Sequence, residues 1–283
     1  MTSGLRGVLL LALLVLLVAQ GCDGDEGISG PEGSSLVTLS LTGLKPLGDG
    51  LNYEAWLLAG TALEPWGSPV VIFDVDEEGR MVDPVADTLL VGPFPGRLDP
   101  AAVMGIAVSL ETSDTLLSYS SFTFLLGGDL AQGSATLTTE HWIAFNQPLA
   151  GAAGRFLLGT PTDEDQENEL GGIWFIDALG NPGLTLPEAS LGWVYEAWVS
   201  LDGVELSTGK FLGPTGADSA NAYSGTGDAP PFPGEDFLAN PPTGLTFPPD
   251  LSGASVFITI EPWMEWDTAP DQPFSLRILE KDD

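Results

Sequence analysis

The chain of 283 residues is poor in the residue types that catalytic and metal sites commonly use, with one cysteine and one histidine. A lone cysteine has no partner for a disulfide within the chain. A single histidine, His141, leaves the inventory for a Ser-His-Asp triad or a histidine-rich zinc site incomplete. We therefore predict that the protein is not an enzyme, with no catalytic residue and no cofactor, and we interpret His141 as a strand residue.

Basic residues are also scarce, because eight lysine and arginine residues face 40 aspartate and glutamate residues. Such a negative surface repels the phosphates of nucleic acids and the headgroups of anionic lipids. We predict no nucleic-acid partner and expect membrane contact to come from a covalent lipid alone. The acidic residues are scattered along the chain, and this pattern also fits simple solubility.

A short apolar run, residues 8–19, follows the lone positive charge of Arg6 near the start of the chain. Twelve helical residues rise about 18 Å, whereas a bilayer core is about 30 Å thick. The run is typical of the hydrophobic region of a secretory signal peptide. The sequence therefore predicts a signal peptide over residues 1–21.

The single cysteine, Cys22, directly follows this region. The stretch Ala19-Gln20-Gly21-Cys22 resembles the lipobox of bacterial lipoproteins, although Ala19 stands where that pattern usually has leucine or valine. The resemblance implies that Cys22 receives the lipid and becomes the mature N-terminus. An ordinary signal peptide followed by a chance cysteine is the alternative. The next residues, 22–34, are acidic and rich in glycine and serine, and we predict a flexible tether there.

The tetrapeptide Tyr-Glu-Ala-Trp occurs at 53–56 and again at 195–198. Three blocks match in the same order, pairing residues 41–58 with 183–200, 94–115 with 247–268, and 121–126 with 273–279. Ordered matches of this kind indicate an internal repeat, which has to be found before the domains are assigned. We predict two units, residues 35–133 and residues 134–283.

Both predicted units have the pattern of β-strands. Apolar and polar residues alternate in LVTLSL (36–41), SVFITIE (255–261) and FSLRIL (274–279), as expected for strands with one buried face. The 36 glycines and 23 prolines interrupt these segments and disfavour helices. We predict an all-β fold of two tandem antiparallel β-sandwich units. The aromatic-rich segment 213–250 is long for a loop, and we expect it to lie against the second unit.

The second unit resembles the extracytoplasmic C-terminal domain of anti-sigma-K factors. Three pieces carry the resemblance: YEAW at 195–198, STGKF at 207–211 and TIEP at 259–262. The resemblance covers about residues 180–280 and implies a β-sandwich. The first unit keeps YEAW and the pair Leu110-Glu111 but lacks the STGKF block. Anti-sigma factors also have a cytoplasmic helical region that binds the sigma factor and a true membrane span. We expect neither in this chain, because the first apolar run is short and nothing basic or helical precedes it.

Two sets of acidic residues are candidate sites, one for glycoside hydrolysis and one for calcium binding. Glu111 and Glu261 occupy matched strand ends and could be proposed as the carboxylate pair of a glycosidase. Such pairs need carboxyl groups about 5–10 Å apart, whereas these two belong to different units. Alternate acidic residues before two glycines form a weak calcium candidate, which consists of Asp163, Asp165, Glu167 and Glu169. The EF-hand order is absent there, and a solvated acidic loop is the simpler interpretation.

The repeated tetrapeptide is interpreted as a structural motif, with the side chains of Tyr53, Glu54, Trp56, Tyr195, Glu196 and Trp198. In a strand, tyrosine and alanine share one face, which we assign to the core, and glutamate and tryptophan share the other. The tryptophan could cover a loop, seal the contact between the units, or stack on a ligand. Packing is the favoured role, because burying an indole contributes several kcal/mol.

These observations favour a non-enzymatic lipoprotein of the bacterial cell envelope that acts as a binding or scaffolding module. Its expected partners are the membrane, through the N-terminal lipid, and an envelope protein or a polysaccharide. The alternative is an envelope sensory or regulatory protein related to the extracytoplasmic domains of anti-sigma factors. A hydrolase is the third and least supported alternative.

Overall fold

The computed structural model describes residues 2–7, 13–18, 35–40, 43–47, 50–60, 65–112, 123–146, 148–149, 151–220, 222–263 and 271–281. These residues form an all-β protein of antiparallel sheets with two short 3-10 helices. None of the described segments is a helix with the length and apolar character needed to cross a membrane. The prediction of an all-β fold is confirmed.

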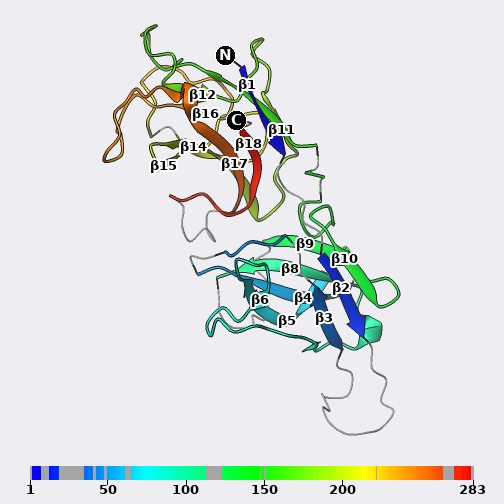
Figure 1. Ribbon diagram of the computed structural model, residues 1–283. Helices are drawn as coiled ribbons and strands as arrows, with labels where there is room; N and C mark the ends of the chain where they lie inside the picture. Colours follow the sequence, from blue (N-terminus) through cyan, green and yellow to red (C-terminus); the bar gives the residue numbers. More distant parts are fainter. Residues whose placement is uncertain are drawn as a thin grey trace, which may run out of the picture.

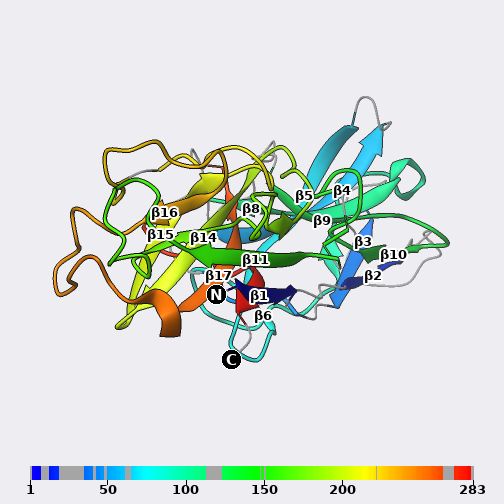
Figure 2. The same ribbon diagram turned by 90° about the horizontal axis from the view of Figure 1, so that it is seen from above.

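The strands gather in two lobes, which lie one above the other in Figure 1 and overlap when seen from above in Figure 2. The first lobe has a sheet of order β6-β5-β4-β8-β9 and a sheet of order β10-β2-β3-β7. Its strands are β2 (Leu13–Val18), β3 (Leu36–Ser40), β4 (Asn52–Gly60), β5 (Pro65–Val75), β6 (Met81–Val82), β7 (Phe94–Pro95), β8 (Gly105–Glu111), β9 (Phe124–Asp129) and β10 (Ser134–Leu137).

The second lobe has one sheet of nine strands in the order β15-β14-β17-β18-β1-β11-β12-β16, with β13 paired to β11. Its strands are β1 (Thr2–Gly7), β11 (Ala153–Leu158), β12 (Gly172–Trp174), β13 (Leu184–Thr185), β14 (Trp193–Leu201), β15 (Val204–Phe211), β16 (Gly234–Asp236), β17 (Ser255–Pro262) and β18 (Arg277–Lys281).

One arrangement of four strands recurs in the two lobes, because β5-β4-β8-β9 and β15-β14-β17-β18 have the same order. Tyr53 of β4 lies opposite Phe73, and Tyr195 of β14 lies opposite Phe211. In both strands the pairing register shifts directly after the alanine of the tetrapeptide. The two copies of the motif therefore occupy equivalent central strands.

The other side of each motif strand is equivalent as well. Glu54 lies opposite Ser109 of β8, and Glu196 lies opposite Thr259 of β17. A 3-10 turn precedes each of these strands, η1 (Pro100–Ala102) before β8 and η2 (Leu251–Gly253) before β17. In each turn the residue before the helix is an aspartate whose carboxylate accepts a backbone N–H, which is a capping interaction.

The N-terminal strands are paired on both sides. β1 lies between β11 and β18, and β2 lies between β10 and β3. Cleavage of a signal peptide over residues 1–21 would remove both β1 and β2 from the mature protein. The second-lobe sheet would then separate into the recurring four-strand set and a second set of β11, β12, β13 and β16.

The long segment 213–250 lies against the second lobe, as the sequence predicts. The rings of Tyr223, Phe237 and Phe247 contact one another with centroids 5.5–5.7 Å apart. Phe237 is fully buried, and the segment contributes β16 to the sheet. Burial of these rings fixes a segment that has little regular structure of its own.

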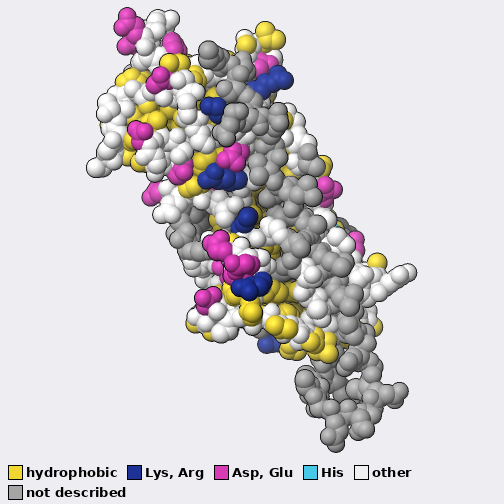
Figure 3. All heavy atoms as spheres, in the orientation of Figure 1, with side chains coloured by type: hydrophobic (Ala, Val, Ile, Leu, Met, Phe, Trp, Pro, Cys, Tyr) yellow, Lys and Arg dark blue, Asp and Glu magenta, His cyan; other side chains and the backbone are white. Residues whose placement is uncertain are grey.

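The lobes touch at the start of β14. The indole N–H of Trp193 donates to the carbonyl of Phe124 in the first lobe at 3.1 Å. The Trp193 ring also packs against Phe145, with the ring centroids 4.9 Å apart. Acidic side chains on the face shown in Figure 3 are spread over both lobes and do not gather in one patch.

Candidate functional site

Each copy of the tetrapeptide belongs to a buried chain of hydrogen bonds. In the first lobe, Trp56 Nε1 donates to Ser109 Oγ at 2.8 Å, and Ser109 Oγ donates to Glu111 Oε1 at 2.5 Å. In the second lobe, Trp198 Nε1 donates to Thr259 Oγ1 at 2.9 Å, and this hydroxyl donates to Glu261 Oε1.

The tryptophans of the motif are internal side chains. Trp56 and Trp198 are each 1% exposed, so neither indole presents a face to a ligand. Tyr53, Ala55 and Leu57 belong to the main core cluster, whereas Trp56 belongs to a smaller cluster on the other face of the sheet. The alternation expected from the sequence is present, and both faces of β4 are buried.

The glutamate of the second copy has a lysine as its charged partner. Lys210 Nζ lies 3.4 Å from Glu196 Oε2, and both side chains are largely buried. The Ser207 hydroxyl donates to the other oxygen of Glu196. In the first lobe the position opposite Glu54 is taken by Ile72. The lysine of the STGKF block is therefore a structural partner of the motif glutamate.

We expect Glu196→Gln to destabilise the second lobe by about 1–3 kcal/mol, because it leaves the Lys210 ammonium partly buried without its countercharge. The double variant Glu196→Gln, Lys210→Met should recover part of that loss, since it removes both charges. Urea denaturation of the wild type, both single variants and the double variant measures this coupling. Additive effects of the two substitutions would contradict a direct ion pair.

The other sequence candidates do not form a common site. Glu111 and Glu261 lie in different lobes, each almost fully buried in its own hydrogen-bond chain. His141 lies in a bend and not in a strand, so that prediction is wrong. His141 begins a turn in which its carbonyl accepts the Ala144 N–H. Its side-chain Nε2 lies 3.2 Å from Asp129 Oδ1. Cys22 lies outside the described residues.

The acidic stretch proposed as a weak calcium candidate forms local turns. Asp163 Oδ1 accepts the Asp165 N–H at 3.2 Å, and Asp165 Oδ1 accepts the Glu167 N–H at 2.9 Å. Glu169 Oε2 accepts the Thr160 N–H at 3.1 Å. Over the part of the chain that is described, no three acidic, histidine or cysteine side chains converge as metal ligands.

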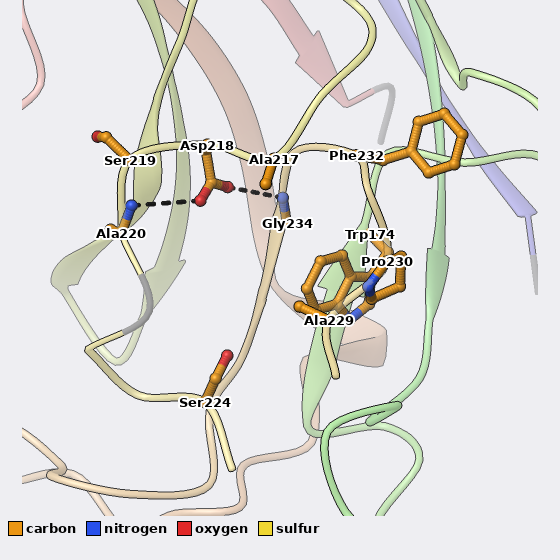
Figure 4. Close-up of a pocket in the computed structure, with 10 residues that line it drawn as sticks. All are labelled: Trp174, Ala217, Asp218, Ser219, Ala220, Ser224, Ala229, Pro230, Phe232 and Gly234. Atoms are coloured by element: carbon orange, nitrogen blue, oxygen red, sulfur yellow. Dashed lines mark hydrogen bonds between the residues drawn. The ribbon is translucent and has the colours of Figure 1, made fainter. Parts of the chain in front are cut away.

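A cavity of about 280 Å³ lies in the second lobe, between the ends of β12 and β16 and the loop that follows β15 (Figure 4). Asp218, Ser219 and Ser224 supply its polar lining, and Trp174 and Phe232 supply aromatic surface. The loop residues come from the segment 213–250, which the rigid sheet holds in place. Loops held on a rigid scaffold in this way commonly carry binding sites.

The Asp218 carboxylate is fixed by two backbone amides, drawn as dashed lines in Figure 4. Gly234 N donates to Oδ2 at 2.8 Å, and Ala220 N donates to Oδ1 at 3.3 Å. Burial raises the pKa of Asp218 to about 7, and the negative charges of Glu235 and Glu196 act in the same direction. Near neutral pH this carboxyl group is therefore close to half ionised.

Two glycines allow the chain to approach Asp218 and Trp174. A Cβ at Gly209 (φ +115°) would lie 2.7 Å from Asp218 Cγ. A Cβ at Gly234 (φ +152°) would lie 2.7 Å from Trp174 Cε3 and 2.5 Å from the Ile173 carbonyl oxygen. The glycine of the STGKF block thus makes room for the carboxylate of the cavity.

Further buried carboxylates hold the wall of the cavity. Trp174 Nε1 donates to Asp236 Oδ1 at 2.6 Å, and Thr162 N donates to Asp236 Oδ2 at 2.8 Å. The Ser224 hydroxyl, which lines the cavity, donates to Glu235 Oε1. Burial raises the pKa of Glu235 to about 7, and the charge of Asp236 acts in the same direction.

A second, apolar cavity of about 420 Å³ lies where β14 begins, beside the contact with the first lobe. Trp193, Trp263, Leu191 and Leu212 line it. Leu191 is 85% exposed, so the edge of this cavity is open to solvent.

Sequence reasoning did not identify Asp218, Trp174 or Glu235 as site residues. The unusual length of the segment 213–250 was the available signal, but it could not select individual side chains. Comparison with protein-family models, with curated proteins and with solved structures gave no match. The resemblance to the anti-sigma-K C-terminal domain therefore stays a prediction that depends on the three quoted motifs.

Proposed function

We propose that this chain is a non-enzymatic binding module of the bacterial cell envelope, built as two tandem β-sandwich units and anchored by a lipid on Cys22. The cavity at Asp218 is the observation that carries the proposal. Glycines and backbone amides arrange a carboxylate beside aromatic surface there, and two serines add polar groups to the lining. A small concave site with a few fixed polar groups is typical of ligand binding.

The buried motif residues support a scaffolding role for the repeated strands. In each lobe the tetrapeptide is used for internal hydrogen bonds and core packing, so recognition falls to the loops outside the recurring sheet. The regulatory alternative has one observation in its favour. The residues that carry the anti-sigma-like resemblance lie side by side on β14, β15 and β17, as parts of one structural unit.

Membrane anchoring is tested by replacing the lipidated residue. We expect wild-type protein, expressed in a bacterial host, to sediment with membranes, and Cys22→Ser to appear in the soluble fraction or to remain unprocessed. Asp25→Asn, three residues later, serves as the control and should behave like the wild type. A Cys22→Ser protein that is processed normally and stays membrane-bound would contradict the lipid anchor.

Ligand binding is tested by filling the cavity. Ala229 lies at its exposed rim, so Ala229→Phe should obstruct the cavity without disturbing the core. The full-length protein is incubated with a small-molecule extract of bacterial envelopes, and retained compounds are identified by mass spectrometry. We expect a compound retained by the wild type and by Ala86→Phe, an exposed change in the first lobe, but lost from Ala229→Phe. Equal retention by all three proteins would contradict binding in this cavity.

A further inference from the structure

We propose that the cavity of the second lobe binds a small organic cation, with an ammonium group of the ligand placed against the Asp218 carboxylate. This inference depends on the proposed function, because it names the ligand class of the same site. It follows from the acceptor capacity of the cavity, from its charge and from its size.

The Asp218 carboxylate has spare capacity for hydrogen-bond donors. A carboxylate offers about four acceptor positions on its two oxygens. The amides of Gly234 and Ala220 occupy two of them, one on each oxygen. Figure 4 shows the carboxylate between these two amides at the wall of the cavity. A ligand with several N–H donors on one atom fits the remaining positions.

The charged groups around Asp218 are mainly negative. Glu235 on β16 and Glu196 on β14 both act on Asp218 as negative charges. Glu235 is fully buried, and its Oε1 accepts a hydrogen bond from the hydroxyl group of the cavity-lining Ser224. The nearby ammonium of Lys210 is engaged by Glu196 at 3.4 Å. A positively charged ligand would supply the countercharge that this arrangement needs.

The cavity favours an organic ammonium over a bare metal ion. Its volume of about 280 Å³ is just below the range of about 300–1,000 Å³ for small-molecule sites and therefore fits only a small ligand. Trp174 and Phe232 add aromatic surface, which attracts organic cations. A metal ion of the calcium type requires six to eight oxygen ligands, and the described residues include no group of three acidic side chains placed to hold one.

Affinity for a cation should rise with pH. Glu235 and Glu196 act on Asp218 as negative charges from the strands packed against it, and the ammonium group of Lys210 pairs with Glu196. A cation binds the ionised carboxylate, and the pKa of Asp218 is raised to about 7. The ionised fraction, and with it the affinity, therefore increases about thirtyfold between pH 5.5 and pH 8.

The test uses the intact protein in mild detergent and isothermal titration calorimetry with n-butylamine. The amine stays protonated over this pH range, as a lysine side chain does. n-Butanol is the uncharged probe of nearly the same shape. Asp218→Asn is compared with Asp202→Asn, an exposed aspartate in the turn between β14 and β15. Because Asp218→Asn also alters two amide hydrogen bonds, Ala229→Phe provides a second variant that blocks the cavity and leaves the carboxylate intact.

We expect saturable binding of n-butylamine, no comparable binding of n-butanol, and at least a tenfold loss in Asp218→Asn and in Ala229→Phe. Asp202→Asn should stay within twofold of the wild type. Equal binding of amine and alcohol, full affinity in Asp218→Asn, or no saturable amine binding would overturn the inference. A neutral or anionic envelope compound that Ala229→Phe excludes would also overturn it, yet would leave the proposed binding function standing. If no compound depends on the cavity, the proposed function fails as well.

Discussion

Tyr195→Ala should lower the free energy of unfolding of the second lobe by about 3–5 kcal/mol, the range observed when a large buried ring is truncated. The Tyr195 side chain is fully buried in the main core and packs against Phe211, with the ring centroids 5.7 Å apart. Its hydroxyl donates to the Pro187 carbonyl at 3.0 Å. Truncation removes both interactions and leaves a cavity at the centre of the recurring sheet.

Chemical denaturation, followed by tryptophan fluorescence, measures this loss. Tyr195→Phe is the matched control, because it keeps the ring and removes only the hydrogen bond, at a cost of about 0.5–1.5 kcal/mol. Tyr53 offers the same comparison in the first lobe, since its hydroxyl donates to the Lys45 carbonyl, also eight residues earlier, at 2.8 Å. An unchanged midpoint in Tyr195→Ala together with lost ligand binding would show that the motif is a recognition surface.

Stability should fall as the pH rises from about 4.5 to about 7. Burial raises the pKa of Glu261 to about 7, with Glu196 adding to the shift. Between the ordinary glutamate pKa and about 7, Glu261 keeps its proton in the folded protein but has released it in the unfolded chain. The contribution of Glu261 to the free energy of unfolding is therefore fully present below the ordinary glutamate pKa and is lost as the pH rises through about 7. The shift of Glu261 alone corresponds to about 3 kcal/mol. Glu235 and Asp218, with pKa values also raised to about 7, act in the same direction.

Glu261→Gln should flatten this dependence, because glutamine stays uncharged at every pH. The measurement is urea denaturation between pH 4.5 and pH 8, for the wild type, Glu261→Gln and the exposed control Glu164→Gln. We expect the slope to decrease in Glu261→Gln and to be retained in Glu164→Gln. A wild type that becomes more stable between pH 5 and pH 7 would contradict the assigned direction.

Local patterns were sufficient to predict the class of the fold and the internal repetition. Two-residue alternation and frequent glycine and proline predicted strands, because side chains of a strand point alternately to opposite faces. The matched blocks identified the strands that prove to be equivalent, with Tyr53 and Tyr195 opposite phenylalanines at the same register. The faces of the tetrapeptide were also predictable, since alternation alone separates Tyr53 from Trp56.

The partners of those residues were decided only by the tertiary structure. Trp198 meets Thr259, 61 residues later, because β14 and β17 pair in one particular register. Glu196 meets Lys210 across a hairpin whose register includes a bulge, which no period in the sequence reveals.

The residues of the cavity were likewise brought together only by the tertiary structure. Trp174 on β12 meets Asp218 and Gly234 of the segment 213–250 only because β16 pairs with β12. The sequence by itself determined that this chain forms repeated antiparallel strands, since strand formation follows from short-range alternation. Only the tertiary structure decided which loops enclose a site, because strand register and packing set the contacts between residues that are distant in the sequence.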